Sequence, residues 1–200
     1  MHIEFLLEEP SAEVFLQGFV GKLLPPGSTW RFIVFQGKKD LLFNLPSRLK
    51  AYSQWMPPDY RLVVLVDEDR EDCAALKRQL ETAALLADLP TKSKPKDGKF
   101  VVLNRIAVEE LEAWIFGDPE ALCAAFPRVP KTIGRKAPYR NPDAISGGTW
   151  ESLERVLKST SYFNGGLPKI QVAREVAKHL DPRRNASMSF RQFVQGLEAL

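Results

Sequence analysis

The 200-residue sequence has only two cysteines and two histidines, and it lacks any long hydrophobic run. Cys73 and Cys123 stand far apart, which excludes the spacing of a disulfide framework or a cysteine-based zinc site. No window approaches the roughly 18 consecutive apolar residues of a membrane span. Acids interrupt the short apolar run within the first ten residues, which is not the pattern of a signal peptide. We therefore expect a soluble, cytoplasmic protein with no membrane partner.

The formal net charge is only +3, but the charged residues are unevenly distributed. Four lysines lie within residues 92–99, and residues 128–140 contain five basic residues and no acid. Acids gather in three other short segments, residues 8–9, 67–72 and 109–112. This separation fits an acidic metal site beside a basic rim that binds phosphate. The alternative interpretation is that these segments are solvated loops and helix ends.

Alternating strand-like and helix-like patterns in the first half of the chain predict an α/β fold. The fully apolar run Leu62–Val66 is typical of a central parallel strand, buried on both faces. The order of elements predicts a four-stranded, Rossmann-like parallel sheet with right-handed crossovers, followed by a helical extension. We expect the α/β core to span residues 1–116 and the extension residues 117–200, packed together as one globular unit. The expected strands are 2–7, 30–35, 62–66 and 100–103. The expected helices are 12–24, 40–52, 71–87, 108–116, 119–126, 149–158, 167–179 and 189–200, with a kink or break at Pro46 in the second. An irregular basic loop is expected at 129–148.

Two aspartates directly follow the apolar strand, in the segment Asp67-Glu68-Asp69. Alternate side chains of an extended backbone share a face about 6–7 Å apart, so Asp67 and Asp69 can converge on one ion. Carboxylate oxygens suit Mg²⁺, and open α/β sheets bind ligands beyond the carboxyl ends of their strands. The alternative is an acidic loop in which Asp69 or a neighbour caps the next helix.

Further acids end the first strand and follow the fourth. Glu8 ends the first strand, and Glu9 is an alternative because the sequence does not fix the direction of the pleat. Glu109, Glu110 and Glu112 begin the helix after the fourth strand, with Glu109 and Glu112 expected on one flank. The alternative is that these acids only favour a helix N-terminus. The candidate metal ligands are Glu8, Asp67, Asp69, Glu110 and Glu112.

The residues Leu6-Leu7-Glu8 and Leu65-Val66-Asp67-Glu68-Asp69 resemble the pattern of the Toprim domain, found in topoisomerases, bacterial primases and OLD-type nucleases. That pattern is a glutamate ending the first strand and an Asp-x-Asp ending a later one. The segment 105–114 resembles the acidic helix that follows in OLD-like members. The chain as a whole is similar to an uncharacterised bacterial family of Toprim-like proteins, with which it shares Glu-Glu-Pro-Ser at 8–11 and Glu-Leu-Glu-Ala-Trp at 110–114. In Toprim domains glycine usually follows the glutamate, and here Glu9 takes its place.

The resemblance implies phosphodiester cleavage that depends on Mg²⁺ or Mn²⁺, in a Toprim-like sheet. It assigns metal binding to Asp67 and Asp69, and metal binding or acid–base work to Glu8. Lys169, which follows two glycines at a helix start, is the candidate for stabilising the charge on phosphorus. Analogy with OLD-type nucleases suggests a defence-system effector with an ATPase partner.

The basic loop offers cations and one aromatic ring, a mixture that suits a nucleic-acid backbone and an unstacked base. The alternative is a solvated loop without a partner. A second functional hypothesis follows from this loop: a catalytically silent Toprim-like module that binds nucleic acid or a protein such as an ATPase. The candidate nucleic-acid contacts are Lys131, Arg135, Lys136, Tyr139 and Arg140.

Overall fold

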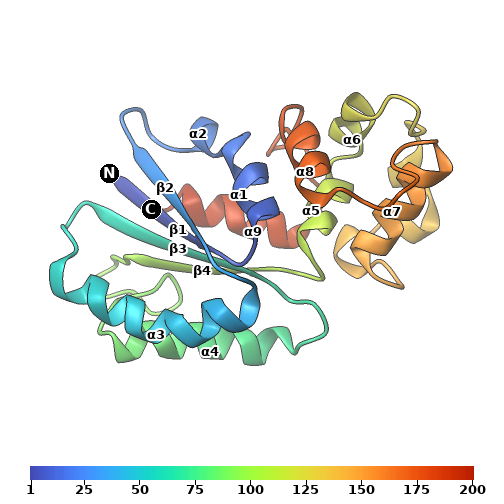
Figure 1. Ribbon diagram of the computed structural model, residues 1–200. Coiled ribbons are helices and arrows are strands. Elements are labelled where there is room, and N and C mark those ends of the chain that lie inside the picture. The colour runs from blue at the N-terminus through green and yellow to red at the C-terminus, as the bar shows by residue number, and fades with distance from the viewer.

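The computed structural model describes all 200 residues and contains one four-stranded parallel sheet, with strand order β2-β1-β3-β4 (Figure 1). In this sheet Leu6 lies opposite Ile33 on one side and Val64 on the other. The predicted α/β class and parallel topology are confirmed. The strands are β1 (His2–Leu7), β2 (Thr29–Val34), β3 (Tyr60–Asp67) and β4 (Val102–Ala107).

The alternation of side chains along the strands divides the hydrophobic core into two layers. Phe5 and Leu7 of β1 belong to the larger layer, and Leu6 belongs to the smaller one. The apolar run 62–66 supplies both layers, because β3 lies between β1 and β4 and is covered on both faces. Its prediction as a central strand is correct.

Helices cover both faces of the sheet (Figure 1). On one face α3 (Lys38–Trp55) lies beside α4 (Cys73–Leu86); on the other lie α1 (Pro10–Gln17), α2 (Val20–Leu23) and α9 (Met188–Leu197). Four more helices gather beyond the carboxyl ends of the strands, and α8 among them packs against α1. They are α5 (Leu111–Gly117), α6 (Pro119–Ala125), α7 (Thr149–Ser159) and α8 (Lys169–Ala177). None of the helices combines the length and apolar character needed to cross a membrane.

Several boundaries differ from the sequence-based expectation. The helix expected over 12–24 is divided into α1 and α2 around Gly18, where a side chain would collide with Ala177 of α8. The expected break at Pro46 is absent: α3 is continuous, because exposed Pro46 leaves its lost hydrogen bond on the solvent side. The basic loop 129–148 contains three short 3₁₀ helices, Ile133–Arg135, Ala137–Tyr139 and Pro142–Ala144.

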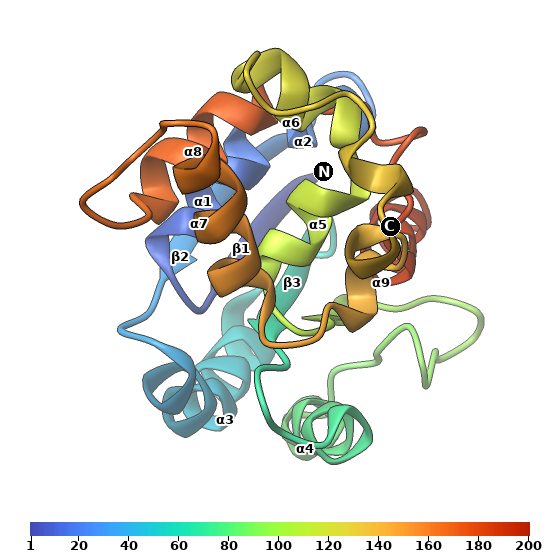
Figure 2. The same ribbon diagram turned by 90° about the vertical axis from the view of Figure 1, so that its right-hand side faces the viewer.

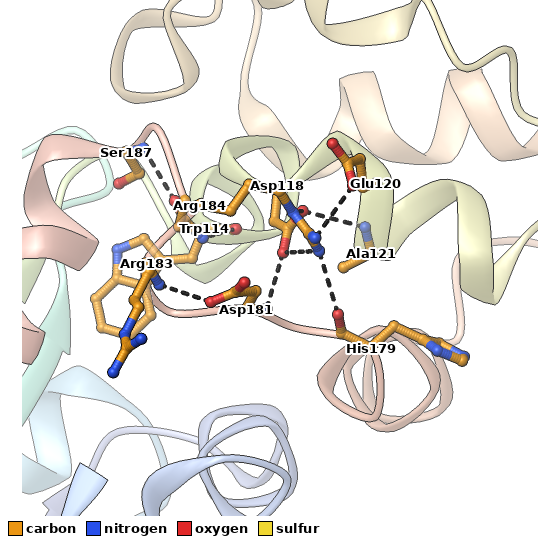
Figure 3. A network of polar contacts seen from close by, with 10 residues as sticks. Trp114, Asp118, Glu120, Ala121, His179, Asp181, Arg183, Arg184 and Ser187 are labelled. Carbon is orange, nitrogen blue, oxygen red and sulfur yellow. Dashed lines mark hydrogen bonds and ion pairs between the residues drawn. The ribbon is translucent and has the colours of Figure 1, made fainter. Parts of the chain in front are cut away.

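A buried carboxylate, Asp118, fastens the segment before α9 to the start of α6 (Figure 3). Asp118 is fully buried and accepts two hydrogen bonds from Arg184, at 2.7 and 2.9 Å. It also accepts from the backbone N–H groups of Asp181 (3.0 Å) and Ala121 (3.1 Å), and so caps α6. Asn185 donates to the Trp114 carbonyl at 2.8 Å. These contacts fix the position of α5, which carries Glu112.

Candidate functional site

Glu8 joins the ends of the first and third strands. Its Oε2 accepts a hydrogen bond of 3.1 Å from the backbone N–H of Asp67. Burial raises the pKa of Glu8, while that hydrogen bond and the ammonium of Lys38 lower it. The neighbouring Glu9 instead accepts from the hydroxyl of Ser11, at the start of α1. Glu8 is therefore the glutamate that contacts the end of β3.

Asp67, the last residue of β3, is a buried carboxylate without a partner. It is 9% exposed, and its carboxylate forms neither a hydrogen bond nor an ion pair. Burial raises its pKa well above the usual value, and Glu112 and Glu8 raise it further through repulsion. A buried charge without compensation is costly, so Asp67 favours either a proton or a cation at its oxygens.

Glu112 in the first turn of α5 is the second buried acid of the site. It is 3% exposed; its Oε1 lies 3.5 Å from Nζ of Lys169, and its Oε2 is buried without any hydrogen-bond partner. Burial raises the pKa of Glu112 to about 7, although Lys169 lowers it. The carboxyl group therefore changes protonation near neutral pH and has one oxygen free for a ligand.

Lys169, the first residue of α8, supplies the positive charge beside these acids. Its ammonium lies 5.7 Å from the centre of the Trp150 ring and faces Glu112. Burial lowers the pKa of Lys169, but the nearby glutamates, above all Glu112 and Glu9, raise it above its usual value. The lysine therefore stays protonated, and α8 brings it from a distant part of the sequence to the acidic edge.

Two of the candidate metal ligands, Asp69 and Glu110, bind other parts of the protein, contrary to expectation. Asp69 does not converge with Asp67, because β3 ends at Asp67 and Asp69 has a left-handed φ of 54°. Its carboxylate pairs with Lys38 at 2.5 Å. Glu110 accepts hydrogen bonds from the Thr149 hydroxyl (2.7 Å) and the backbone N–H of Trp150 (3.0 Å), which caps α7.

The expected arrangement of acids on one flank of a helix is also wrong. Because α5 begins only at Leu111, Glu109 and Glu110 precede it and do not share a helical face with Glu112. Glu109 has a φ of 62°, and its backbone N–H donates to Glu68 at 3.0 Å. The structure contains no group of three or more Asp, Glu, His or Cys side chains placed to hold one metal ion.

Lys38 is a central residue of this edge that the sequence analysis missed. It begins α3, is 8% exposed, and donates to the Glu68 carbonyl at 3.1 Å besides pairing with Asp69 and, at 3.3 Å, with Glu71. The signal was its position: the Gly-Lys pair at 37–38 lies in the short segment after the second strand, which ends at Val34, at the same edge as the acids. Lys38 holds the loop after β3 in place.

An open cleft of about 720 Å³ is lined by Asp69 and Glu110, but not by Asp67, Glu112 or Lys169. It is bounded by residues 69–71, residues 109–110 and the start of α7, which faces the viewer together with α5 in Figure 2. Its walls carry five acids and a single basic residue, Arg70. An anionic substrate in this cleft therefore requires cations to offset the repulsion.

The candidate nucleic-acid contacts divide into two groups. Lys131, Arg135, Lys136 and Arg140 are exposed, as a binding surface requires. Tyr139 differs from expectation, because one face of its ring stacks on Phe116 with centroids 5.0 Å apart and planes 7° from parallel. That face packs against the hydrophobic core and is not free to receive a base.

Comparison with known proteins yields one family. No match was found among curated proteins or among solved structures. Residues 7–198, nearly the whole chain, match the family described as "Domain of unknown function (DUF4276)". The chain therefore belongs to the DUF4276 family.

Proposed function

We propose that this protein is a Toprim-like, Mg²⁺-dependent enzyme that cleaves phosphodiester bonds, and that it acts as the nuclease-like effector of a defence system with an ATPase partner. The nucleic-acid substrate would approach the carboxyl edge of the sheet. The proposal combines the resemblance of the strand-end motifs to Toprim domains with the chemistry of the buried acids. Mn²⁺ would serve in place of Mg²⁺.

The observation that carries the proposal is the pair of buried, incompletely bonded carboxylates, Asp67 and Glu112. One oxygen of the Glu112 carboxylate is buried without a hydrogen-bond partner, and neither oxygen of the Asp67 carboxylate has a partner. Leaving the buried Oε2 of Glu112 unsatisfied is unfavourable, whereas a cation would satisfy it and would also pair with the Asp67 carboxylate. Mg²⁺ is commonly held by one or two protein carboxylates and completes its shell with water and substrate phosphates. Two open carboxylates fit that requirement without a third.

The remaining residues have roles that follow from their contacts. Bound Mg²⁺ would neutralise the phosphate charge and polarise the attacked phosphorus. Lys169, charged and oriented by Glu112, would bind a phosphate oxygen as a point charge. Glu8 would accept the proton of the attacking water as the new P–O bond forms; the old P–O bond breaks and its oxygen takes a proton from solvent. Asp69 and Glu110 act as positioning residues through Lys38 and α7.

Cleavage assays on the full chain test this function. Plasmid, single-stranded DNA and RNA are incubated with Mg²⁺, with Mn²⁺ and with EDTA. We expect metal-dependent cleavage that Asp67→Asn abolishes and that Asp88→Asn preserves. Asp88 is exposed and has a left-handed φ of 57°, which asparagine also adopts, so it matches the chemical change away from the site. Full activity of Asp67→Asn, or cleavage in EDTA, would refute the mechanism.

Metal binding has its own readout in titration calorimetry with Mn²⁺. The ion must displace protons from acids with raised pKa values, so affinity should rise between pH 6 and pH 8. Asp67→Asn should abolish the binding heat, and Asp88→Asn should leave it intact.

The competing function is a catalytically silent binding module that uses the exposed basic residues of 131–140. Tight, metal-independent binding of nucleic acid without turnover would favour that module.

A further inference from the structure

The two edge strands of the sheet differ in whether their outward backbone groups have hydrogen-bond partners. At the β4 edge, the outward carbonyl of Val102 accepts from the backbone N–H of Lys92 at 3.1 Å. The outward carbonyl of Asn104 accepts from Lys77 at 2.7 Å and from Arg105 at 3.0 Å. This edge is therefore covered by hydrogen-bond partners from the chain itself.

The β2 edge has no such cover. The N–H groups of Thr29 and Phe35 donate to Met1 and Leu7, so the odd-numbered residues of β2 face β1. Backbone groups alternate along a strand, so those of Trp30, Phe32 and Val34 face away from the sheet. No strand pairs with β2 on this side of the sheet, and no other segment of the chain forms hydrogen bonds with these outward backbone groups. Natural proteins usually protect an open edge of this kind.

A groove of about 710 Å³ runs along the open edge, between β2 and α3. Ile33 from β2 and Trp55 from α3 supply apolar contact, and the Trp55 side chain is 56% exposed. The acids of the groove are already bonded within the protein. Asp40 accepts from the Gln36 N–H at 2.9 Å and from Asn44 at 2.7 Å, and Glu4 accepts from the Tyr52 hydroxyl.

The basic residues of the groove, in contrast, have no acidic partner, although Arg48 contacts the Tyr52 hydroxyl. Neither Arg31 nor Arg48 forms an ion pair. Arg31 is exposed, and the guanidinium of Arg48 lies 5.4 Å from the centre of the Phe35 ring. The groove thus offers two unpaired cations beside a row of unpaired backbone donors and acceptors.

We propose that the β2 edge is a docking site for an extended, acidic peptide segment of a partner protein, which adds to the sheet as a fifth strand. The backbone of the peptide would bond to Trp30, Phe32 and Val34, and acidic side chains at alternate positions would face Arg31 and Arg48. Side chains of an extended peptide alternate between two faces, so acids at every second position all lie on the face that meets the arginines. The site is separate from the acidic cleft, so it stands whether or not the proposed cleavage is correct.

The edge itself argues for a peptide over other occupants. A free phosphate or nucleotide would use the arginines but leave the outward backbone groups of the strand unbonded. A second copy of this chain, paired β2 to β2, would bring the same arginines of both copies together, and like charges at an interface are unfavourable. An extended acidic peptide satisfies both the backbone groups and the cations.

The test measures binding of labelled eight-residue peptides to the full chain by fluorescence anisotropy. We expect a peptide of alternating glutamate and valine to bind more tightly than one of the same composition with the glutamates in a block, or one with lysine for glutamate. N-methylation of alternate amides on the bonding side should abolish binding. Equal binding of the alternating and block peptides, or no binding of either, would overturn the proposal.

Charge-reversal variants locate the site. The double variant Arg31→Glu/Arg48→Glu should weaken binding of the alternating peptide by about tenfold or more. The control Lys39→Glu/Lys50→Glu makes the same charge change at exposed positions of α3 outside the groove and should keep the affinity within about twofold of the parent. Loss in both variants would reduce the effect to net charge and overturn the proposal. Two further results would overturn the proposal. One is sedimentation of the protein as a dimer that Arg31→Glu dissociates, and the other is displacement of the labelled peptide by oligothymidine at a lower concentration than by unlabelled peptide.

Discussion

Replacing Glu112 with glutamine tests the central electrostatic claim about the site, that a buried carboxyl group there changes protonation near neutral pH. Its pKa rises from the usual 4.5 to about 7 on folding, chiefly through burial. Below pH 4.5 the group is protonated in both the folded and the unfolded chain, so it has no effect on stability. As pH rises from 4.5 to 7 the unfolded chain loses the proton first, and the folded state becomes progressively less stable.

The size of the effect follows from the shift in pKa. A shift from 4.5 to about 7 corresponds to about 3 kcal/mol, at about 1.4 kcal/mol per pKa unit. Glutamine keeps the shape of the side chain and has no proton to lose. Glu112→Gln should therefore stabilise the metal-free protein by about 3 kcal/mol at pH 8 and by less than about 1 kcal/mol at pH 5.

Urea unfolding of the parent and the variant in EDTA, at both pH values, measures this difference. Glu198→Gln is the control, because Glu198 is exposed and forms no ion pair; it should change stability by less than about 0.5 kcal/mol. An equal effect of Glu112→Gln at pH 5 and pH 8 would refute the reasoning. A loss of stability at pH 8 would show instead that Glu112 is charged and stabilised by Lys169.

Two further stability predictions concern packing around the site. Asp118→Ala should cost about 2–4 kcal/mol in urea unfolding, because it leaves a helix N-terminus and the half-exposed Arg184 guanidinium without their partner. Glu120→Ala, which removes an acid that is 74% exposed from the same arginine, should cost less than about 1 kcal/mol, and similar losses in both would contradict the assignment. Gly18→Ala should cost about 1–3 kcal/mol, because the new Cβ would lie 2.5 Å from Cβ of Ala177. Gly165→Ala, where nothing lies within 4 Å, is its control, and equal melting temperatures for the two variants would disprove the collision.

The first three strands could be predicted from sequence because their signals are local, whereas the strand expected at 100–103 lies at Val102–Ala107. The apolar run Leu62–Val66 is long enough to show burial on both faces, and the structure places it between β1 and β4. The helix boundaries near Gly18 and Pro46 could not be predicted, because they depend on neighbours. Gly18 meets a helix 159 residues later in the chain, at Ala177, and Pro46 is tolerated because it faces solvent.

The sequence by itself determined that acids reach the carboxyl edge of the sheet, since a residue that ends a parallel strand must lie there, but it left Glu8 and Glu9 as alternatives. Glu8 and Asp67 met at that edge as expected, joined by one hydrogen bond. Only the tertiary structure decided which carboxylates remain available for chemistry. Lys38 pairs with Oδ2 of Asp69, and the start of α7 bonds to Oε2 of Glu110, so each of these acids is tied to a structural partner. These partners come from distant segments, and no spacing within a motif encodes them.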